Sequence, residues 1–360
     1  MPDLLSPAFY ADVEAMHETF RELRSQGPVW RDEPNNLWAV IGQPELIDVE
    51  RRDDVFCSGL GYRAQHAPGE QDMISLDDPQ HNAQRKVVAR HFTPKAVQRF
   101  EPLLDSIMSD IVDEFIDAGE IEVVDQLAAA LPARATAHLI GFPDDQWRLI
   151  KSCSERLMRI DGTQDPQVQT EFLGAIMDFA PLLGPICADR RENPKDDLLS
   201  VWTHAGFEDQ LIVQETGLFI SGGAETTRTV IARGLVELAA RPDQWEALAE
   251  DPSLISGAVE EMIRWVTPLN NFFRTATRPG AVGDTQVDEG GRVILLYPSA
   301  NRDERIFEDP YTFDIKRNPN PHVSFGFGTH FCLGASLARL ELAVMLRHLT
   351  RRIRDLEVLD

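Results

Sequence analysis

The sequence predicts a mainly α-helical fold with small β-sheets, and two long segments of helical character carry most of this prediction. The first segment begins with Thr93 as the N-cap and Pro94 as the first helical residue. Apolar residues follow at helical spacing, at 97, 100, 104, 107, 111 and 115, until Gly119 ends the segment. The second segment, residues 208–241, contains no proline, and one continuous helix of this length would extend about 50 Å.

The small sheets are predicted from two short apolar runs near opposite ends of the chain. Residues 37–41 (Leu-Trp-Ala-Val-Ile) and 293–296 (Val-Ile-Leu-Leu) have the composition of strands, and a glycine-rich turn at 289–291 precedes the second run. The chain contains no internal repeat, low-complexity tract or Ser/Gly-rich linker. We therefore expect residues 1–360 to form a single domain, although the length alone would also allow two.

Composition and charge exclude several classes of function. The chain has 360 residues, 43% of them hydrophobic, and a formal net charge of −24, which argues against nucleic acid and anionic membranes as partners. Residues 1–15 lack the apolar core of a signal peptide, and no uninterrupted apolar run is long enough to span a bilayer, so we expect no membrane anchor. The four cysteines form no C-x-x-C pair, which fits the reducing cytoplasm.

The segment Phe325-Gly-Phe-Gly-Thr-His-Phe-Cys332, closed by Gly334, is the most informative part of the chain. It places a cysteine on a glycine-rich loop immediately before an amphipathic helix, where the helix dipole and free N–H groups are expected to hold the thiol as a thiolate. The glycines let the backbone approach a flat, bulky group. Thiolate ligation of haem iron fits this arrangement. The alternative is that Cys332 is a small buried apolar residue, as most unpaired cysteines are.

This loop resembles that of the cytochrome P450 superfamily, whose pattern Phe-Gly-x-Gly-x-His-x-Cys-x-Gly is filled at every position. The resemblance extends from Phe20 to about Arg352 and implies the cytochrome P450 fold, of the soluble bacterial type. It implies haem b (iron protoporphyrin IX) as the cofactor and Cys332 as the axial ligand of the haem iron. Haem-binding positions that follow from the loop pattern are Phe325, His330 and Gly334.

A Gly-Gly pair lies in the middle of the second helical segment, at 222–223. Each glycine costs a helix interior about 1 kcal/mol relative to alanine, so a local distortion is expected. The distortion alone could mean a kink or a close helix crossing. The resemblance instead implies a distal helix in which Gly222 and Gly223 open an oxygen-binding groove. It implies that Thr226 hydrogen-bonds dioxygen, and that Glu225 relays protons; Thr227 is expected to be structural.

Further residues are assigned through the same resemblance. Glu261 and Arg264 lie three residues apart on one helix face, and with Arg317 they match a structural clamp beneath the haem. His81 and Arg85, at i and i+4, together with Arg274 and His330, match the family's partners for the haem propionates. Each of these four residues, taken singly, is more often a solvated surface residue.

Substrate contacts are expected from variable, apolar segments. The candidates are Met73, Ile74, Leu157, Phe219, Ala224, Leu269 and Asn270 within the run 269–272. The alternative for each is plain core packing. Residues 318–332, 223–228 and 264–265 resemble most closely actinobacterial enzymes that hydroxylate the side chain of cholesterol and related steroids.

The predicted function is that of a haem-thiolate monooxygenase that inserts one oxygen atom from O2 into a C–H bond of a lipophilic substrate, with a steroid or sterol side chain favoured. Alternatives are a P450 acting on fatty acids or terpenoids, a peroxide-using enzyme, or a non-catalytic haem-thiolate binding protein. Electrons are expected from a ferredoxin and an NAD(P)H-linked ferredoxin reductase. Lys86, Arg90 and Arg339 are candidate docking residues. Family members usually continue into a terminal β-hairpin, which is expected to be absent or truncated here.

Overall fold

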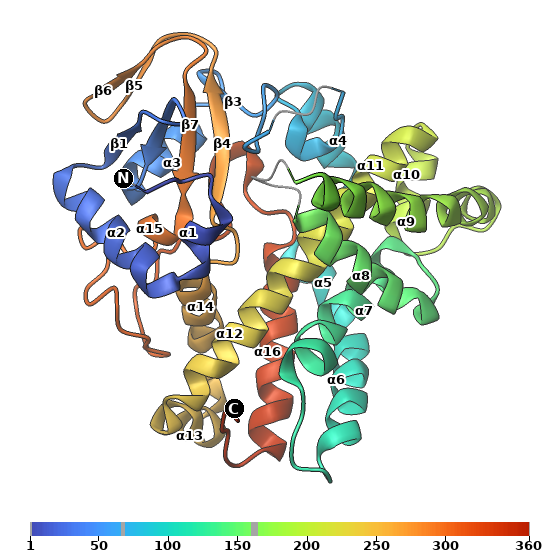
Figure 1. Cartoon of the computed structure of the whole chain (residues 1–360). Helices are drawn as coiled ribbons and strands as arrows, with labels where there is room; N and C mark the ends of the chain where they lie inside the picture. Colours follow the sequence, from blue (N-terminus) through green and yellow to red (C-terminus); the bar gives the residue numbers. More distant parts are fainter. Residues whose placement is uncertain (1, 66–68, 160–164, 360) are drawn as a thin grey trace.

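The computed structural model describes residues 2–65, 69–159 and 165–359 and confirms a mainly helical fold with small sheets (Figure 1). The helices are α1 (Pro7–Ala11), α2 (Val13–Gln26), α3 (Gln43–Arg51), α4 (Gln80–Ala89), α5 (Pro94–Val97), α6 (Glu101–Phe115), α7 (Ala130–Ile140), α8 (Trp147–Met158), α9 (Pro166–Glu192), α10 (Leu198–His204), α11 (Asp209–Ile220), α12 (Thr226–Ala239), α13 (Pro242–Glu250), α14 (Ile255–Val266), α15 (Tyr297–Ala300) and α16 (Ala335–Arg352). The strands are β1 (Val29–Asp32), β2 (Leu37–Val40), β3 (Phe56–Cys57), β4 (Asn271–Ala276), β5 (Gly280–Val282), β6 (Thr285–Val287) and β7 (Arg292–Leu296).

The larger sheet has the strand order β1-β2-β7-β4-β3, and the two predicted strands, β2 and β7, are parallel neighbours at its centre. Both faces of this pair are buried, because alternate side chains of each strand pack into two different hydrophobic clusters. Ile294 and Leu296 join Leu4 and Phe20 on one face, whereas Val293 and Leu295 join α3 on the other. This two-sided burial explains why these strands are apolar without alternation.

The first predicted helical segment forms two helices. α5 begins at Pro94 with Thr93 as its N-cap, and a short 3-10 turn at Gln98–Phe100 separates it from α6. The expected single helix is therefore wrong at this point, and Pro102 gives the reason: it has no N–H to continue the hydrogen-bond ladder, but it is tolerated in the first turn of a new helix. α6 ends at Phe115, and Gly119, with φ of +74°, lies in the following turn.

The second segment forms α11 and α12, joined by one π-helical turn at Ser221–Glu225. The distortion predicted from Gly222 and Gly223 is therefore present, and it widens the helix where the distal groove was expected. In Figure 1, α12 crosses the centre of the molecule beside α14 and α16. The largest hydrophobic cluster lies among these helices.

Among the described residues, α9 alone is long and apolar enough to cross a membrane. This is weak evidence for a membrane span, because core helices of soluble proteins have the same length and composition. Its sequence is interrupted by acidic residues that pair with α8 or the segment after it: Asp178 binds Arg156 at 2.6 Å, and Glu171 lies 3.5 Å from Arg159. Near its end, the buried Arg190 binds Asp197 at 2.6 Å. The absence of a membrane anchor stays a prediction.

Candidate active site

The cysteine loop is fixed against the end of α3. The backbone N–H of Cys332 donates to the carbonyl of Phe325 at 2.8 Å, which closes the loop on itself. Gly328 has φ of +67°, and a Cβ atom there would lie 2.2 Å from the carbonyl oxygen of Glu50, so no other residue fits. Thr329 donates its hydroxyl to Asp53 at 2.5 Å. The loop therefore holds Cys332 at the N-terminal end of α16 with its conformation set by tertiary contacts.

Burial raises the pKa of the Cys332 thiol, although the N–H groups of Gly334 and Ala335 and the guanidinium groups of Arg85 and Arg339 act to lower it. Desolvation of the anion therefore opposes the helix dipole and the N–H groups, and the expectation of a thiolate stays a prediction. A coordinating metal ion removes the thiol proton outright. Cys332 therefore fits a ligand of iron better than a free nucleophile.

Four basic side chains from three separate segments meet beside this loop. The rings of His81 and His330 have centroids 4.3 Å apart, and Arg85 donates to the carbonyl of Phe331 at 2.6 Å. Burial, followed by the charges of Arg274, His81 and Arg85, lowers the pKa of His330 to about 2. The buried Nε2 of His81 has no hydrogen-bond partner among the described residues. The two guanidinium groups of Arg85 and Arg274 in this region fit an anionic group such as a haem propionate.

Glu50, at the end of α3, is a site residue that the sequence reasoning missed. Its carboxylate accepts a hydrogen bond from the Tyr297 hydroxyl at 2.8 Å and lies 3.8 Å from the guanidinium of Arg274. Burial raises the pKa of Glu50 to about 7, while Arg274 and the Tyr297 hydroxyl act to lower it. Glu50 therefore pairs with the guanidinium of Arg274 inside the fold. No local pattern around residue 50 indicates this contact, since it forms only when α3 meets β4 and the cysteine loop.

The two glycines of the distal helix have different surroundings. A Cβ atom on Gly222 would have no heavy atom within 4 Å, so this residue faces open space, as expected for a groove. A Cβ atom on Gly223 would lie 2.8 Å from the hydroxyl oxygen of Thr136 on α7. The expectation that Gly223 opens the groove is therefore wrong: it permits a close helix crossing, which was the packing alternative.

The predicted proton-delivery residues are adjacent, but their side chains have different partners. The hydroxyl of Thr226 donates to the carbonyl of Gly222 at 2.8 Å, across the π-helical turn. The carboxylate of Glu225 binds Arg228 at 3.0 Å, and Arg228 also binds Glu155 of α8 at 2.9 Å. Arg228 was missed, although its spacing of three residues from Glu225 was visible in the sequence. Thr227 is buried, consistent with a structural residue.

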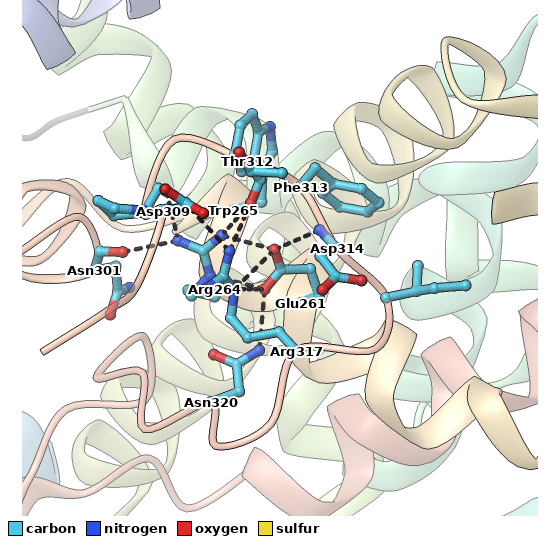
Figure 2. Close-up of polar contacts among 12 residues, drawn as sticks. Glu261, Arg264, Trp265, Asn301, Asp309, Thr312, Phe313, Asp314, Arg317 and Asn320 are labelled. Carbon is cyan, nitrogen blue, oxygen red and sulfur yellow. Dashed lines mark hydrogen bonds and ion pairs between the residues drawn. The ribbon is translucent and has the colours of Figure 1, made fainter. Parts of the chain in front are cut away.

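Figure 2 shows the network around Glu261 and Arg264, which are both fully buried and paired at 2.7 Å. Arg317 lies 3.3 Å from the same carboxylate, and the side chain of Asn320 donates to it at 3.1 Å. The remaining guanidinium N–H groups of Arg264 bind the carbonyl oxygens of Asn301, Pro310 and Thr312. Because every charge has several partners, this cluster can offset the desolvation cost of burial and fix the segment that leads to the cysteine loop.

The candidate substrate contacts do not all share one environment. Met73, Leu157 and Ala224 are buried, whereas Ile74, Leu269 and Asn270 are half-buried. The ring of Phe219 packs between Phe92 and Trp202, with centroid distances of 5.7 and 5.4 Å, which favours the core-packing alternative for this residue.

Among the candidate docking residues, Lys86 on α4 and Arg90, the residue directly after α4, are exposed. Arg339 differs from both, because its guanidinium binds Glu260 at 2.6 and 2.8 Å and stacks on the ring of Phe325 at 4.5 Å. These contacts, with a hydrogen bond from His322, lower the pKa of Glu260 to about 2 despite its burial. Arg339 is therefore part of the support beneath the loop. After α16, the described residues to 359 contain no strand.

Comparison with known proteins places this geometry in a family. A family model described as "Cytochrome P450" matches residues 188–354. The "Steroid C26-monooxygenase" of Mycolicibacterium smegmatis is 37% identical over 99% of this chain and 90% of its own length. The solved structure of Mycobacterium marinum cytochrome P450 CYP268A2 in complex with pseudoionone has a TM-score of 0.88 and 31% identity, covering 99% of this chain and 94% of its own.

A second solved structure, CYP109E1 from Bacillus megaterium in complex with testosterone, has a TM-score of 0.84 and 29% identity, covering 92% of this chain and 89% of its own. Together with the cysteine loop, the basic cluster beside it and the distal π-helical turn, these similarities account for nearly the whole chain. The chain belongs to the cytochrome P450 family of haem-thiolate monooxygenases.

Proposed function

We propose that this protein inserts one oxygen atom from O2 into a C–H bond on the side chain of a steroid or sterol. The observation that carries the proposal is the similarity to a steroid C26-monooxygenase over 99% of the chain, combined with complete cysteine-loop and distal-helix motifs. When bound through Cys332, haem supplies an iron at which O2 is reduced with two electrons, and the thiolate favours O–O cleavage.

The chain itself would bind the cofactor and keep it in place. Cys332 would hold the haem iron through its sulfur, and the guanidinium groups of Arg85 and Arg274, with the rings of His81 and His330, would bind the propionates. Glu50 would act on the cofactor indirectly, by orienting Arg274. The clamp of Glu261, Arg264 and Arg317 would likewise act indirectly, by fixing the segment before the cysteine loop.

Protons would reach the reaction through the distal helix. The Thr226 hydroxyl, which donates to Gly222 across an open face, can instead donate to dioxygen. Glu225 is joined through Arg228 to Glu155, and these three side chains are each about one-fifth to one-quarter exposed. These ion pairs connect the distal turn with α8, and the partly exposed carboxyl groups of Glu225 and Glu155 can exchange protons with solvent.

A steroid would be bound mainly through burial of apolar surface. The half-buried Ile74 and Leu269, with Met73 and Ala224, offer apolar contacts, and Asn270 offers one polar group. Burial of a rigid fused-ring lipid at about 25 cal/mol per Å² supplies binding free energy at little cost in conformational entropy.

Electrons would come from an acidic ferredoxin and its NAD(P)H-linked reductase in the cytoplasm. The exposed Lys86 of α4 lies next to Arg85, which touches the cysteine loop. The lining of a surface hollow of about 650 Å³ includes Lys86, Arg90, Lys195 and Asp196. A basic patch on a chain with a net charge of −24 attracts an acidic partner to that face. Charge reversal at Lys86 and Arg90 should raise the ferredoxin concentration needed for half-maximal turnover.

The test is a titration of the purified holoenzyme with cholest-4-en-3-one, cholesterol, a fatty acid and a monoterpene. We expect the sterols to shift the ferric haem toward high spin and to yield side-chain-oxidised products with NADH and a surrogate redox chain. A shift with only the fatty acid or the terpene would overturn the substrate assignment. Turnover supported by hydrogen peroxide alone would indicate a peroxygenase, and binding without any product would indicate a non-catalytic protein.

A further inference from the structure

The turn that carries the candidate substrate contacts Met73 and Ile74 is attached to the distal helix by two adjacent side chains. The side-chain oxygen of Gln214 accepts the backbone N–H of Gln71 at 2.6 Å. The neighbouring carboxyl group of Glu215 accepts the backbone N–H of Met73 at 2.9 Å. Both acceptors lie on α11, so this helix fixes the turn through its backbone, independently of which side chains the turn presents.

A second helix binds the same turn. Gln84 on α4, next to the propionate candidate Arg85, donates its side-chain N–H to the carbonyl of Gln71 at 3.0 Å. Within the turn, Asp72 accepts hydrogen bonds from the backbone N–H and the hydroxyl of Ser75, at 3.1 and 2.7 Å. The shape of the turn is therefore set internally, while its position is set by α11 and α4.

Glu215 makes its contact from a fully buried position. Its side chain is 0% exposed, and its second carboxyl oxygen has no hydrogen-bond partner among the described residues. Burial, with the nearby charge of Asp72, raises the pKa of Glu215 to about 8, so the carboxyl group is mainly neutral at pH 7. An apolar side chain at this place would avoid the cost of a buried unpaired oxygen. The contact that the Glu215 carboxyl group does make is the hydrogen bond with the backbone N–H of Met73.

We propose that Gln214 and Glu215 are specificity-determining positioning residues, which set where Met73 and Ile74 lie relative to Thr226 and so decide which carbon of the substrate is oxidised. The proposal rests on the proposed function in one respect, namely that this turn lines the substrate site. α11 leads directly into the π-helical turn and Thr226, which lies about 16 Å along the helix from Glu215. One helix thus carries both the proton-delivery group and the supports of the turn, which fixes the distance between them.

The experiment compares the wild-type holoenzyme with Glu215→Leu, Glu215→Gln, Gln214→Leu and Thr216→Val. Glu215→Gln keeps an oxygen acceptor for the Met73 N–H, whereas leucine of similar size does not. Thr216→Val is the matched control, because Thr216 is also fully buried on α11 and its hydroxyl also has no partner among the described residues. Haem content and the reduced carbon monoxide spectrum verify that each variant is folded.

The readouts are the dissociation constant of cholest-4-en-3-one, from the spin-state shift, and the distribution of oxidised carbons among the products. We expect Glu215→Leu to weaken binding by about tenfold and to spread oxidation over more than one carbon. Glu215→Gln should restore the wild-type distribution, and Thr216→Val should not alter it. A wild-type distribution and affinity in folded Glu215→Leu would overturn the proposal.

If Glu215→Leu does not retain haem, the proposal is tested with Gln214→Leu, which removes the contact with Gln71 on the more exposed side of the turn. The readout is again the distribution of oxidised carbons among the products. A broadened product distribution supports the proposal, and an unchanged one overturns it. If the wild-type enzyme oxidises another lipophile and no sterol, the assignment of a sterol substrate is wrong. The positioning role of Gln214 and Glu215 is then tested by the same comparison of variants with that lipophile as substrate. A wild-type protein that responds to none of the lipophiles overturns both proposals.

Discussion

The imidazole rings of His81 and His330 lie with their centroids 4.3 Å apart, bringing the start of α4 into contact with the cysteine loop. Burial lowers the pKa of both rings, and the charges of Arg274 and Arg85 lower that of His330 further. Two neutral rings and two guanidinium groups therefore share one small region, in which the carboxylate of Glu50 lies 3.8 Å from Arg274 and that of Asp78 lies 3.4 Å from the Nδ1 atom of His81. The two guanidinium groups favour an anionic group in this region, as expected for a haem propionate.

The first prediction concerns retention of the cofactor. His330→Phe keeps the ring packing but removes a donor, and Arg85→Met removes a charge, so each should accelerate haem loss. A hydrogen bond to a charged group contributes about 1.5–3 kcal/mol, which corresponds to at least about a tenfold faster loss. Transfer of haem to apomyoglobin measures the rate. Arg90→Met, at the exposed residue directly after this helix, is the control, and equal rates in all four proteins would refute the assignment.

The second prediction identifies the ligand. Cys332→His should abolish the thiolate signature in the spectrum of the reduced carbon monoxide complex, since only this cysteine lies on the glycine-rich loop. Cys57, Cys153 and Cys187 are buried elsewhere, and their replacement by serine should leave the signature intact. Loss of the signature in one of these serine variants, with retention in Cys332→His, would require another ligand.

The third prediction concerns proton delivery. Thr226→Ala should keep haem and substrate binding but divert reducing equivalents to peroxide, because the hydroxyl acts only after oxygen has bound. The measurement is product formed per NADH consumed. Thr227→Val is a matched control, since Thr227 is buried beside it. An unchanged yield in Thr226→Ala would remove this residue from the proton path.

The partners of Glu225 extend this prediction. Glu225→Gln should slow turnover more than it lowers the yield per NADH. Arg228→Met should have a similar effect, because Arg228 joins Glu225 to Glu155. Normal turnover in Arg228→Met would restrict the path to Glu225 itself.

The sequence predicted those parts of the structure that depend on local chemistry. Strands β2 and β7 follow from their apolar composition, and the π-helical turn follows from the cost of two adjacent glycines in a helix. The clamp residues were identified by spacing and family resemblance together, and the structure brings Glu261, Arg264 and Arg317 into contact.

The parts that were missed depend on contacts between distant segments. Gly223 allows its helix to pass close to Thr136, which lies on another helix. Neither local sequence indicates that these two helices cross at this point. Glu50 meets Arg274 only in the folded chain, and the pKa of Cys332 depends on a balance between burial and hydrogen bonds that spacing cannot give. Arg228 is different, because its spacing of three residues from Glu225 is visible in the sequence alone.

The fourth prediction separates the two distal glycines. Gly223→Ala should destabilise the protein, because the added methyl group would lie 2.8 Å from the Thr136 hydroxyl, whereas Gly222→Ala meets no atom within 4 Å. Overpacking of this kind costs about 1–3 kcal/mol. Thermal unfolding of both variants is the measurement. The double variant Gly223→Ala, Thr136→Ala should recover most of the loss, and a loss that persists would place the cause in the helix itself.

The fifth prediction concerns Glu341 on α16, whose side chain is 2% exposed and whose pKa burial raises to about 8. In the unfolded chain a glutamate titrates near pH 4.3, so between about pH 4.3 and 8 the folded state binds more protons than the unfolded state. The free energy of unfolding contributed by this group is therefore fully present below the pKa of the unfolded chain, and it is lost as the pH rises through the pKa of the folded state.

Glu341→Gln stays neutral at every pH. The difference in melting temperature between variant and wild type should therefore move in favour of the variant from pH 5 to pH 9. Glu246→Gln, at an exposed position on α13, should follow the wild-type curve throughout. Parallel curves for wild type and Glu341→Gln would mean that Glu341 takes up no extra proton on folding.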